Sequence, residues 1–520
     1  MKRLHLLISI SLLCSIRASG QTTDEFTNMV DVLPPAPNAA AITRYGGIGL
    51  NKNTGTPNIE IPLFTIKGRR LSTNIALKYS SGGLKVDEIA SRVGMGWILQ
   101  SGGVITRTVR GITDELNTRI RPWANVGVNW STWNFARMVV GSTASSGGYD
   151  SEPDLFSFNF DGYGGTFIID SANNVYDLTH SALKFTFNLS ATDWNFKIVT
   201  PNGVAYYFGG STATEKTKRD QTCGKSFSAY VPTAWYLKEI VHPNGEKITF
   251  GYTGFTYKYD NGLTQSMYAP ASDAPGCSPC NILPTSTCVN ESNTNGVRLT
   301  NISSALESVV ISYINRTDCE DKLVSRIEYK DASSNILKFF NLSYTVVTAT
   351  TPSGSSGGSY AGISYTPYLT SVAEFSPDSA FVKPYLFTYN DAAGRPPRLS
   401  YSQDHWGYFN NKPNQYFVPP PTNTQLINSF TYATAARDPD TKYAIKGMLS
   451  KITYPTGGID SILYESNDYY GTNSTSTKHQ LNCSVTGTGF STQVTKTSNF
   501  SINTGQDVKL VINCIDNTSG

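Results

Sequence analysis

The chain has 520 residues, which is enough for several hydrophobic cores, and only 16% of them are charged, against roughly 25% in an ordinary soluble domain. Aromatic residues make up 12%, and 44 Gly and 26 Pro supply many turn formers, so the composition favours half-buried strands over helices and predicts an all-β fold. The net charge of +3, with no stripe of Lys and Arg, gives no reason to expect nucleic acid or an anionic membrane as a partner.

The N-terminal end of the chain has the features of a secretory signal peptide. Lys2 and Arg3 precede a mostly apolar run, 4–16, and small residues follow at 18–20. The apolar run is too short to cross a bilayer as a mature helix. Cys14 raises the alternative of a lipoprotein signal, but a bulky residue precedes it where a small one is needed. We therefore expect cleavage after residue 20 and a mature protein that is secreted or held at the cell surface, without a transmembrane segment.

The first mature segment, 21–45, is predicted to be an extended lead-in, because the Pro-rich run 34–37 blocks regular structure. Strands are expected directly after it. Segments 59–63 and 71–79 alternate apolar and polar residues, which is the period of a strand with one face toward water. The whole region 46–465 is therefore expected to be rich in β-strands.

Turn-forming residues indicate where these strands should reverse. Asp161-Gly162 lies inside the largely apolar stretch 156–169 and predicts a hairpin. Asn261, in an Asp-Asn-Gly sequence, predicts a further turn. Segment 87–99 is compatible with a short helix, although the glycines in it weaken that prediction.

An internal repeat occurs in the strand-rich region. Each copy has an apolar residue, a second apolar residue three positions later, a Pro-x-Gly turn and a terminal Tyr. The first copy consists of Leu237, Ile240, Pro243, Gly245 and Tyr252, and the second of Leu449, Ile452, Pro455, Gly457 and Tyr464. Looser copies run from Val324 to Tyr344 and from Leu369 to Tyr389. Each copy predicts a β-hairpin, and because one hairpin cannot bury its own apolar face, the hairpins should stack sideways into a larger sheet.

Seven cysteines remain after cleavage of the signal peptide, and in an oxidising compartment most of them should form disulfides. Cys483 and Cys514 lie alone in the last segment and are expected to pair with each other. The other five are Cys223, Cys277, Cys280, Cys288 and Cys319, an odd number that leaves a free thiol or a partner outside the chain. A zinc site built from the last four is the alternative, but only one CxxC pair is present and export favours disulfides.

The last part of the chain differs in texture from the rest. From about residue 467 the sequence is rich in Ser, Thr and Asn. With its expected disulfide, this tail predicts the start of a separate β-sandwich that the chain does not complete. We therefore expect 466–520 to be an incomplete β domain and the chain to be part of a longer protein.

Several spaced motifs lie between residues 55 and 408. They are GTPNIEIPLF at 55–64, YSSGGLKVDEIAS at 79–91, VGMGW at 93–97, GGVITR at 102–107 with GITDE at 111–115, PDLFSF at 153–158 and QDHWGY at 403–408. Together they resemble the start of the large secreted RHS/YD-repeat proteins of Bacteroidota, over about residues 30–465. The chain is also distantly similar to the shell-forming parts of insecticidal toxin complexes.

The resemblance implies a β-rich region that precedes YD repeats, which wind into a hollow shell. It also implies a variable C-terminal domain that carries any toxin activity. This chain departs from the pattern, because its sequence contains no long YD array and no C-terminal effector domain. The active part of such a protein is therefore expected outside this sequence.

Patterns that suggest chemistry have simpler structural explanations. The G-x-S-x-G sequence at 354–358 lies in a Ser/Gly-rich loop, whereas a nucleophile elbow needs a strand before it and a helix after it. His405 is expected to be buried and hydrogen-bonded beside a core Trp406. The acidic pairs 87–88 and 114–115 lack the spacing of a calcium loop and are expected to cap loops or strand edges. We expect no enzyme activity, no cofactor and no metal site.

Two functions remain for a chain of this kind. The first is a structural shell region of an exported RHS-type polypeptide, with the downstream part of the same polypeptide as its partner. The alternative is a cell-surface adhesin or glycan-binding module that recognises surface glycans or a target cell. Aromatic rings clustered in solvent on one sheet would favour the adhesin, and rings that point into cores would favour the shell.

Overall fold

A computed structural model describes most of the chain between residues 32 and 466. The described ranges are 32–33, 35–37, 39, 55–57, 59–110, 113–114, 153–170, 172–190, 193–221, 227–267, 285–350, 364–378, 380, 384–421 and 433–466. Contacts divide the chain into two units, Met1–Glu465 and Ser466–Gly520. The account below concerns the first unit, and the predicted incomplete β domain lies outside the described residues apart from Ser466.

The all-β prediction is confirmed, because strands dominate the described residues. The strands are β1 (Val32–Leu33), β2 (Ile59–Lys67), β3 (Ser72–Tyr79), β4 (Trp97–Ser101), β5 (Gly103–Arg110), β6 (Leu155–Phe160), β7 (Tyr163–Ile169), β8 (Val175–Asp177), β9 (Lys184–Ser190), β10 (Asp193–Val199), β11 (Ala205–Gly209), β12 (Thr214–Gln221), β13 (Phe227–Val241), β14 (Lys247–Met267), β15 (Thr285–Ser303), β16 (Glu307–Asn315), β17 (Lys322–Asp331), β18 (Ile336–Thr348), β19 (Tyr365–Phe375), β20 (Tyr385–Tyr389), β21 (Leu449–Thr453) and β22 (Ile459–Ser461). Within the described ranges, helical structure is limited to residues 37, 39 and 364 and to the short elements η3 (Ala392–Gly394) and α4 (Thr441–Ala444). Within the described ranges, no helix has both the length and the hydrophobicity needed to cross a membrane.

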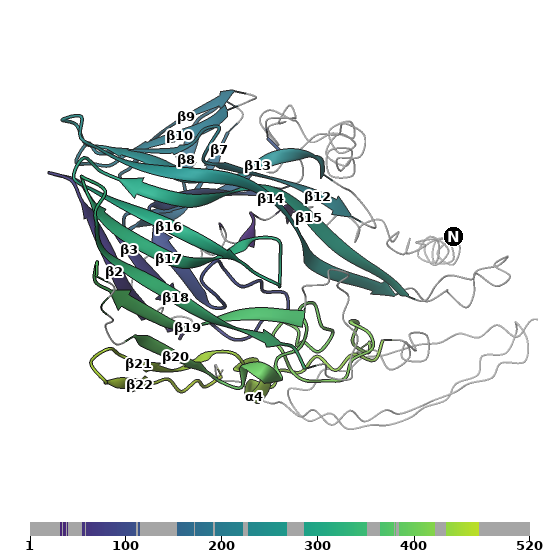
Figure 1. Ribbon diagram of the computed structural model, residues 1–520. Helices are drawn as coiled ribbons and strands as arrows, with labels where there is room; N and C mark the ends of the chain where they lie inside the picture. The colour runs from purple at the N-terminus through teal and green to yellow at the C-terminus, as the bar shows by residue number, and fades with distance from the viewer. Residues whose placement is uncertain are drawn as a thin grey trace, which may run out of the picture. The chain divides into compact units, whose positions relative to one another are not determined.

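The strands from β13 to β22 form an antiparallel meander in which each strand pairs with the next one along the chain. Figure 1 shows this meander as a stack of tilted strands from β13 down to β22. A second sheet, β2-β3-β4, is also antiparallel and is separate from the meander in its hydrogen bonding. The predicted strands at 59–63 and 71–79 are β2 and β3.

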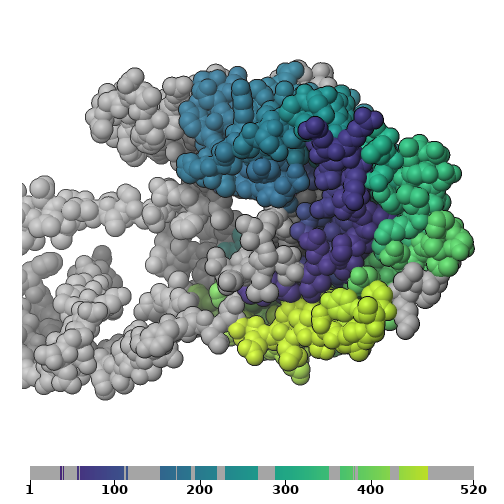
Figure 2. All heavy atoms as spheres, turned by 90° about the vertical axis from the view of Figure 1, so that its left-hand side faces the viewer, coloured from purple at the N-terminus to yellow at the C-terminus, as the bar shows by residue number. Residues whose placement is uncertain are grey.

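The two sheets share one hydrophobic core. Ile66 and Leu77 from the small sheet belong to the same buried cluster as Ile302, Ile327 and Leu369 from the meander. Figure 2 shows the purple residues of β2 to β5 flanked by the blue, green and yellow residues of later strands. The meander therefore buries its apolar face against the small sheet, which a single hairpin could not do.

An aromatic-rich part of the core lies between two groups of strands. β5, β6, β7 and β8 pair in order, as do β9, β10, β11 and β13, and the β5–β13 pairing joins the two groups. Phe156 stacks on Phe167 at 5.0 Å between ring centroids, and it also meets Phe196 and Trp235 of the second group at 5.8 Å. These rings account for much of the aromatic content of the region.

One of the two turns predicted from the sequence is confirmed and the other is wrong. The hairpin at Asp161-Gly162 is confirmed: both residues have positive φ, 45° and 80°, and Phe160 pairs with Tyr163. The turn predicted at Asn261 is wrong, because β14 runs through it and a register shift relative to β15 accommodates the extra residue. A polar Asp-Asn-Gly sequence therefore forms a β-bulge here, which uses the same backbone freedom as a turn.

The short helix predicted at 87–99 is also wrong. Residues 87–96 form turns and isolated bridges, and Trp97 begins β4. Gly94 and Gly96 have φ of +96° and +75°, a left-handed conformation that ends a helix. In the predicted extended lead-in, Val32–Leu33 pairs with β5, while Ala36 and Ala39 are fully buried.

Candidate functional site

The two copies of the sequence repeat form the hairpins β13–β14 and β21–β22. Their Pro-x-Gly turns have the same geometry. The N–H of Gly245 donates to the carbonyl of His242 at 2.8 Å, and the N–H of Gly457 donates to that of Tyr454 at 2.9 Å. Both glycines have φ near +90°, namely 91° and 89°, which an L-residue rarely adopts.

The terminal tyrosine of each repeat donates its hydroxyl to the backbone carbonyl of the first residue of the same repeat. We name this contact a tyrosine clasp. The Oη–O distances are 2.7 Å for Tyr252–Leu237, 2.6 Å for Tyr344–Val324, 2.7 Å for Tyr389–Leu369 and 2.7 Å for Tyr464–Leu449. A fifth clasp joins Tyr313 to Leu299 at 2.6 Å. This copy was not among those expected from the sequence, although Leu299 and Ile302 have the same spacing as the other copies.

A β-bulge beside each clasp explains the three-residue spacing of the apolar pair. In a regular strand, residues three positions apart point to opposite faces. On β17, however, Val324 pairs with Tyr313 and Arg326 pairs with Ser312, so Ser325 is an extra residue. The extra residue turns Val324 and Ile327 to the same buried face. The corresponding residues in the other copies are Lys238, Thr300, Thr370 and Ser450.

The clasps are linked in series across the meander. Each clasp tyrosine except the last, Tyr464, also pairs across strands with the first residue of the next copy. The pairs are Tyr252 with Leu299, Tyr313 with Val324, Tyr344 with Leu369 and Tyr389 with Leu449. We call the five tyrosines the tyrosine ladder. Burial raises the pKa of Tyr313 and Tyr464 to about 12 and that of the other three well above the usual value, so all five remain hydrogen-bond donors.

The VGMGW motif at 93–97 packs against this ladder. The indole Nε1 of Trp97 donates to the hydroxyl of Tyr389 at 2.9 Å, and the N–H of Met95 donates to the carbonyl of Pro367 at 3.0 Å. A Cβ on Gly94 would lie 2.8 Å from the backbone nitrogen of Leu369, so only glycine fits. The motif therefore has a packing role.

Two motifs that are distant in sequence, 79–91 and 403–408, pair with each other. Lys85 forms an isolated bridge with Tyr408, and the N–H of Val86 donates to the carbonyl of Gly407 at 3.1 Å. The carboxylate of Asp404 shapes the second motif, because its Oδ1 accepts the backbone N–H groups of residues 406 and 408 at 2.8 and 2.9 Å. These contacts indicate a structural role for both motifs.

The prediction for His405 and Trp406 is wrong. Both side chains are exposed, and Trp406 has 66% of its surface in solvent. The turn that Asp404 caps directs these two side chains outward while Asp404 itself is buried. The sequence pattern of a histidine beside a tryptophan does not reveal this direction.

The PDLFSF motif contributes a buried ion pair. Asp154 and Arg107 are both fully buried, and Arg107 Nε donates to Asp154 Oδ2 at 2.7 Å. Asp154 also accepts the N–H of Arg110 at 2.8 Å, and the N–H of Asp154 donates to the Asp114 carboxylate at 3.0 Å. Asp114 of the second acidic pair is thus a loop cap, and Glu115 lies outside the described residues.

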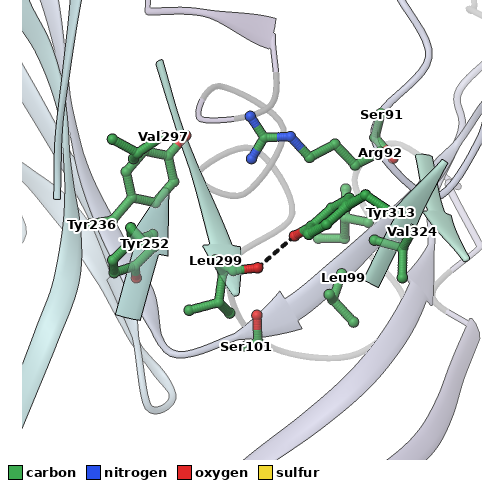
Figure 3. Close-up of a pocket in the computed structure, with 11 residues that line it drawn as sticks. Ser91, Arg92, Leu99, Ser101, Tyr236, Tyr252, Val297, Leu299, Tyr313 and Val324 are labelled. Atoms are coloured by element: carbon green, nitrogen blue, oxygen red, sulfur yellow. Dashed lines mark hydrogen bonds between the residues drawn. The ribbon is translucent and has the colours of Figure 1, made fainter. Parts of the chain in front are cut away.

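A small cavity with a mostly apolar lining lies beside the ladder. Its volume is about 60 Å³, and Arg92, Tyr236, Tyr252 and Tyr313 are among the residues that line it. Figure 3 shows Arg92 extending across this cavity toward Tyr236, with the Tyr313 clasp below. A cavity of this size has room for a few water molecules and not for a sugar or a peptide.

The guanidinium of Arg92 has a fixed carboxylate partner. Asp321 accepts Arg92 Nε at 2.8 Å and Arg298 Nε at 2.7 Å. Burial alone would raise the pKa of Asp321, but the two guanidinium groups outweigh burial and hold that pKa below its usual value. The arrangement is a buried ion-pair network, in which the Nη2 atom of Arg92 is left without a hydrogen bond.

Two of the seven candidate cysteines lie in the described ranges. Cys288 on β15 is disulfide-bonded. Cys319 is not in a disulfide: its thiol is free and buried, and burial raises its pKa to about 11. The remaining candidates, Cys223, Cys277, Cys280, Cys483 and Cys514, lie outside the described residues. Across those ranges, no group of three or more His, Cys, Asp or Glu residues is placed to hold a metal ion.

Exposed aromatic rings do not gather on one sheet face in the described part of the chain. The exposed ones are Tyr176 on β8, Tyr230 on β13, Tyr365 on β19 and Trp406 in a loop. Most of the other rings lie in or against the buried clusters. By the criterion of ring exposure, this distribution favours a packed wall over an aromatic binding face.

No protein-family model matches the chain, and no curated protein sequence matches it. Solved structures with similarity include TcdB2-TccC3, with a TM-score of 0.36 and 12% identity over 70% of this chain and 17% of that chain. The Tc holotoxin pore of Photorhabdus luminescens has a TM-score of 0.32 and 11% identity over 70% and 16% of the two chains. The N-terminal domain of the effector protein SpvB from Salmonella typhimurium strain LT2 has a TM-score of 0.31 and 12% identity over 61% of this chain and 98% of that domain. This chain thus spans less than a fifth of the first two, and at these values no function is transferred to it.

Proposed function

We propose that the region up to residue 465 is a non-enzymatic structural wall of a larger exported polypeptide of the RHS type. Its role is to enclose or present a downstream part of the same polypeptide. The observation that carries this proposal is the tyrosine ladder, five clasps in series across the meander. In this proposal the protein is secreted or held at the cell surface after removal of residues 1–20.

A repeated clasp is suited to a wall because it stabilises each strand pair independently. A buried hydroxyl-to-carbonyl bond contributes about 1 kcal/mol net, and breaking it leaves a buried carbonyl without that donor. The motifs that suggested a site support this role. In these motifs Gly94 permits close backbone packing, Trp97 donates a hydrogen bond to the ladder, and Asp404 caps a turn.

The glycan-binding alternative receives less support. It would need several rings side by side in solvent, and the exposed rings of the described residues lie on different elements. The cavity beside the ladder is also too small for a sugar ring. Glycan binding is therefore the function to test next if the test of the structural wall is negative.

The test is the length and protease resistance of the native product. Intact mass of the secreted protein from its own cells should show a product longer than 520 residues. In that full-length product, the part after the wall should resist protease, and Tyr344→Phe combined with Tyr389→Phe should increase its cleavage. A native product that ends at Gly520 would overturn the proposal, and glycan-array binding of that product would then be measured.

A further inference from the structure

Arg395 is a buried arginine that has no ion-pair partner among the described residues. It follows η3 directly, and only 2% of its surface is in solvent. Its Nε and Nη1 atoms are buried and make no hydrogen bond. A guanidinium does not lose its proton in a protein, so Arg395 keeps a charge that burial makes costly.

The hydroxyl of Tyr368 is a second unsatisfied donor at the same place. Tyr368 lies on β19, it is 1% exposed, and its Oη is buried without a hydrogen bond. Arg395 lies close enough to act on this hydroxyl, but no hydrogen bond of normal geometry joins the two side chains. Burial raises the pKa of Tyr368, so the hydroxyl keeps its proton. Two donor side chains therefore meet in the core, and these buried N–H and O–H groups have no acceptor.

The carboxylates around this pair do not neutralise the arginine. Asp391, at the other end of η3, pairs with the Nζ of Lys446. Glu88 acts on Tyr368 through its charge, but no ion pair joins Glu88 to Arg395. In the part of the chain that the structure describes, the charge of Arg395 thus has no compensating carboxylate.

The surroundings of the two donors limit the size of any ligand. Ala90, Met95 and Tyr368 form a buried cluster, and Tyr389 and Ala392 pack against it. The ring of Tyr368 lies 4.8 Å from that of Tyr389, so the cluster adjoins the tyrosine ladder. Because both donor side chains are almost fully covered, a ligand of several atoms would have to displace their neighbours, whereas a single-atom ion would not.

We propose that Arg395 and Tyr368 bind a monovalent anion of halide size, such as chloride, between η3 and β19. The anion accepts hydrogen bonds from both side chains and compensates the buried charge. A water molecule would accept the same hydrogen bonds but would leave the charge uncompensated. Since only the folded chain contains the site, bound halide stabilises the fold. This inference does not depend on the proposed role as a wall.

Urea unfolding of the full chain at constant ionic strength tests the site. Raising chloride from about 10 to about 300 mM in place of gluconate should lower the equilibrium constant of unfolding by about threefold to thirtyfold. Constant ionic strength excludes general screening as the cause. Gluconate is the reference anion because it is too large for the site.

Three variants separate anion binding from packing. Arg395→Met removes the charge at similar side-chain length, so the chloride effect should disappear and the protein in gluconate should be no less stable than the wild type. Tyr368→Phe removes one donor and keeps the ring, so the chloride effect should become smaller. Arg326→Met is the matched control, since Arg326 pairs with Glu328 at 2.8 Å and its loss should leave the chloride effect unchanged.

Anomalous diffraction from crystals of the full chain soaked in sodium bromide locates the ion without any variant. A bromide peak in contact with both Arg395 and Tyr368 is expected. Water or no density at that place would overturn the proposal, and so would halide peaks found only elsewhere. A wild-type protein whose unfolding does not depend on chloride, or a chloride effect that persists undiminished in folded Arg395→Met, would also overturn it.

Discussion

Single buried tyrosine hydroxyl groups connect the strands of this protein through hydrogen bonds to backbone carbonyls. Tyr389 is the most connected clasp residue, because its hydroxyl donates to Leu369 and accepts from the indole of Trp97. The same atom thus joins the meander to the small sheet. Because two hydrogen bonds depend on this one hydroxyl, its loss is expected to lower the free energy of unfolding.

Tyr389→Phe should lower the free energy of unfolding by about 1–3 kcal/mol, because it leaves both the Leu369 carbonyl and the Trp97 N–H without this partner. Urea denaturation followed by tryptophan fluorescence measures the change. Tyr385→Phe on the same strand is the control, since Tyr385 is half-buried and packs edge-on against Tyr454. Equal effects of the two substitutions would contradict a special role for the clasp.

Gly96 is the second residue whose identity the packing dictates. Its φ is +75°, and a Cβ would lie 2.5 Å from the ring of Tyr79. Gly96→Ala should therefore cost more than about 2 kcal/mol, the sum of backbone strain and a ring displacement. Gly457→Ala is the control: φ is +89° but the space around the Cβ is open, so about 1 kcal/mol of strain is expected. A thermal unfolding series compares them, and a smaller loss for Gly96→Ala would refute the close approach.

At the level of strands, the repeated element is a hairpin with a bulge rather than a regular hairpin. The bulge lets an apolar pair three positions apart face one core, as Leu299 and Ile302 do. At several copies the extra residue also donates a side-chain hydroxyl to the neighbouring strand. These bonds run from Thr300 to Gly251, from Thr370 to Ser343 and from Ser450 to Thr388.

Deletion of Ser325 tests the bulge. Without this residue the register closes, and Ile327 should rotate from the core to the opposite face. We expect loss of the cooperative urea transition or a strong reduction of its midpoint, with loss of near-ultraviolet circular dichroism. Ser325→Ala keeps the backbone and should change the free energy of unfolding by less than about 0.5 kcal/mol. A deletion variant as stable as Ser325→Ala would exclude the bulge as a requirement of the repeat.

For the molecule as a whole, the small sheet and the meander form a single core within the unit Met1–Glu465. The unit should therefore fold as one cooperative block whose stability depends on both sheets.

A chain that ends at Glu465 should keep the main unfolding transition of the 520-residue chain, with a midpoint within about 2 °C. Differential scanning calorimetry of the two proteins provides the comparison. If the shorter chain loses cooperative unfolding, residues 466–520 must complete the core. The matched comparison is a chain that lacks 59–101, which removes β2, β3 and β4 and should not fold cooperatively.

Much of the fold class was accessible from composition and local pattern. Alternation of apolar and polar residues located β2 and β3, and the Asp161-Gly162 pair located a hairpin, because both signals act over a few neighbouring residues. The repeat was also visible as Leu237 to Tyr252 and Leu449 to Tyr464. These features depend on propensities that each short segment carries itself.

The errors came from properties that distant residues control. Asn261 sits in a turn-like sequence, yet pairing with β15 draws it into a strand. Trp406 is a large aromatic residue of the type often found in a core, yet the Asp404 carboxylate holds a turn in which the Trp406 side chain is exposed. The local sequence determines neither which strand a segment pairs with nor the direction of a side chain in a turn.

Sequence alone was sufficient for an all-β protein built from repeated hairpins, since strand period and turn chemistry are local. Long-range packing was required for the tyrosine clasps and for the pairing of 79–91 with 403–408. Each of these depends on segments that meet across the sheet after the bulges have set the register. Burial and hydrogen-bond satisfaction are properties of that assembled neighbourhood, and they decide which residues hold the strands together.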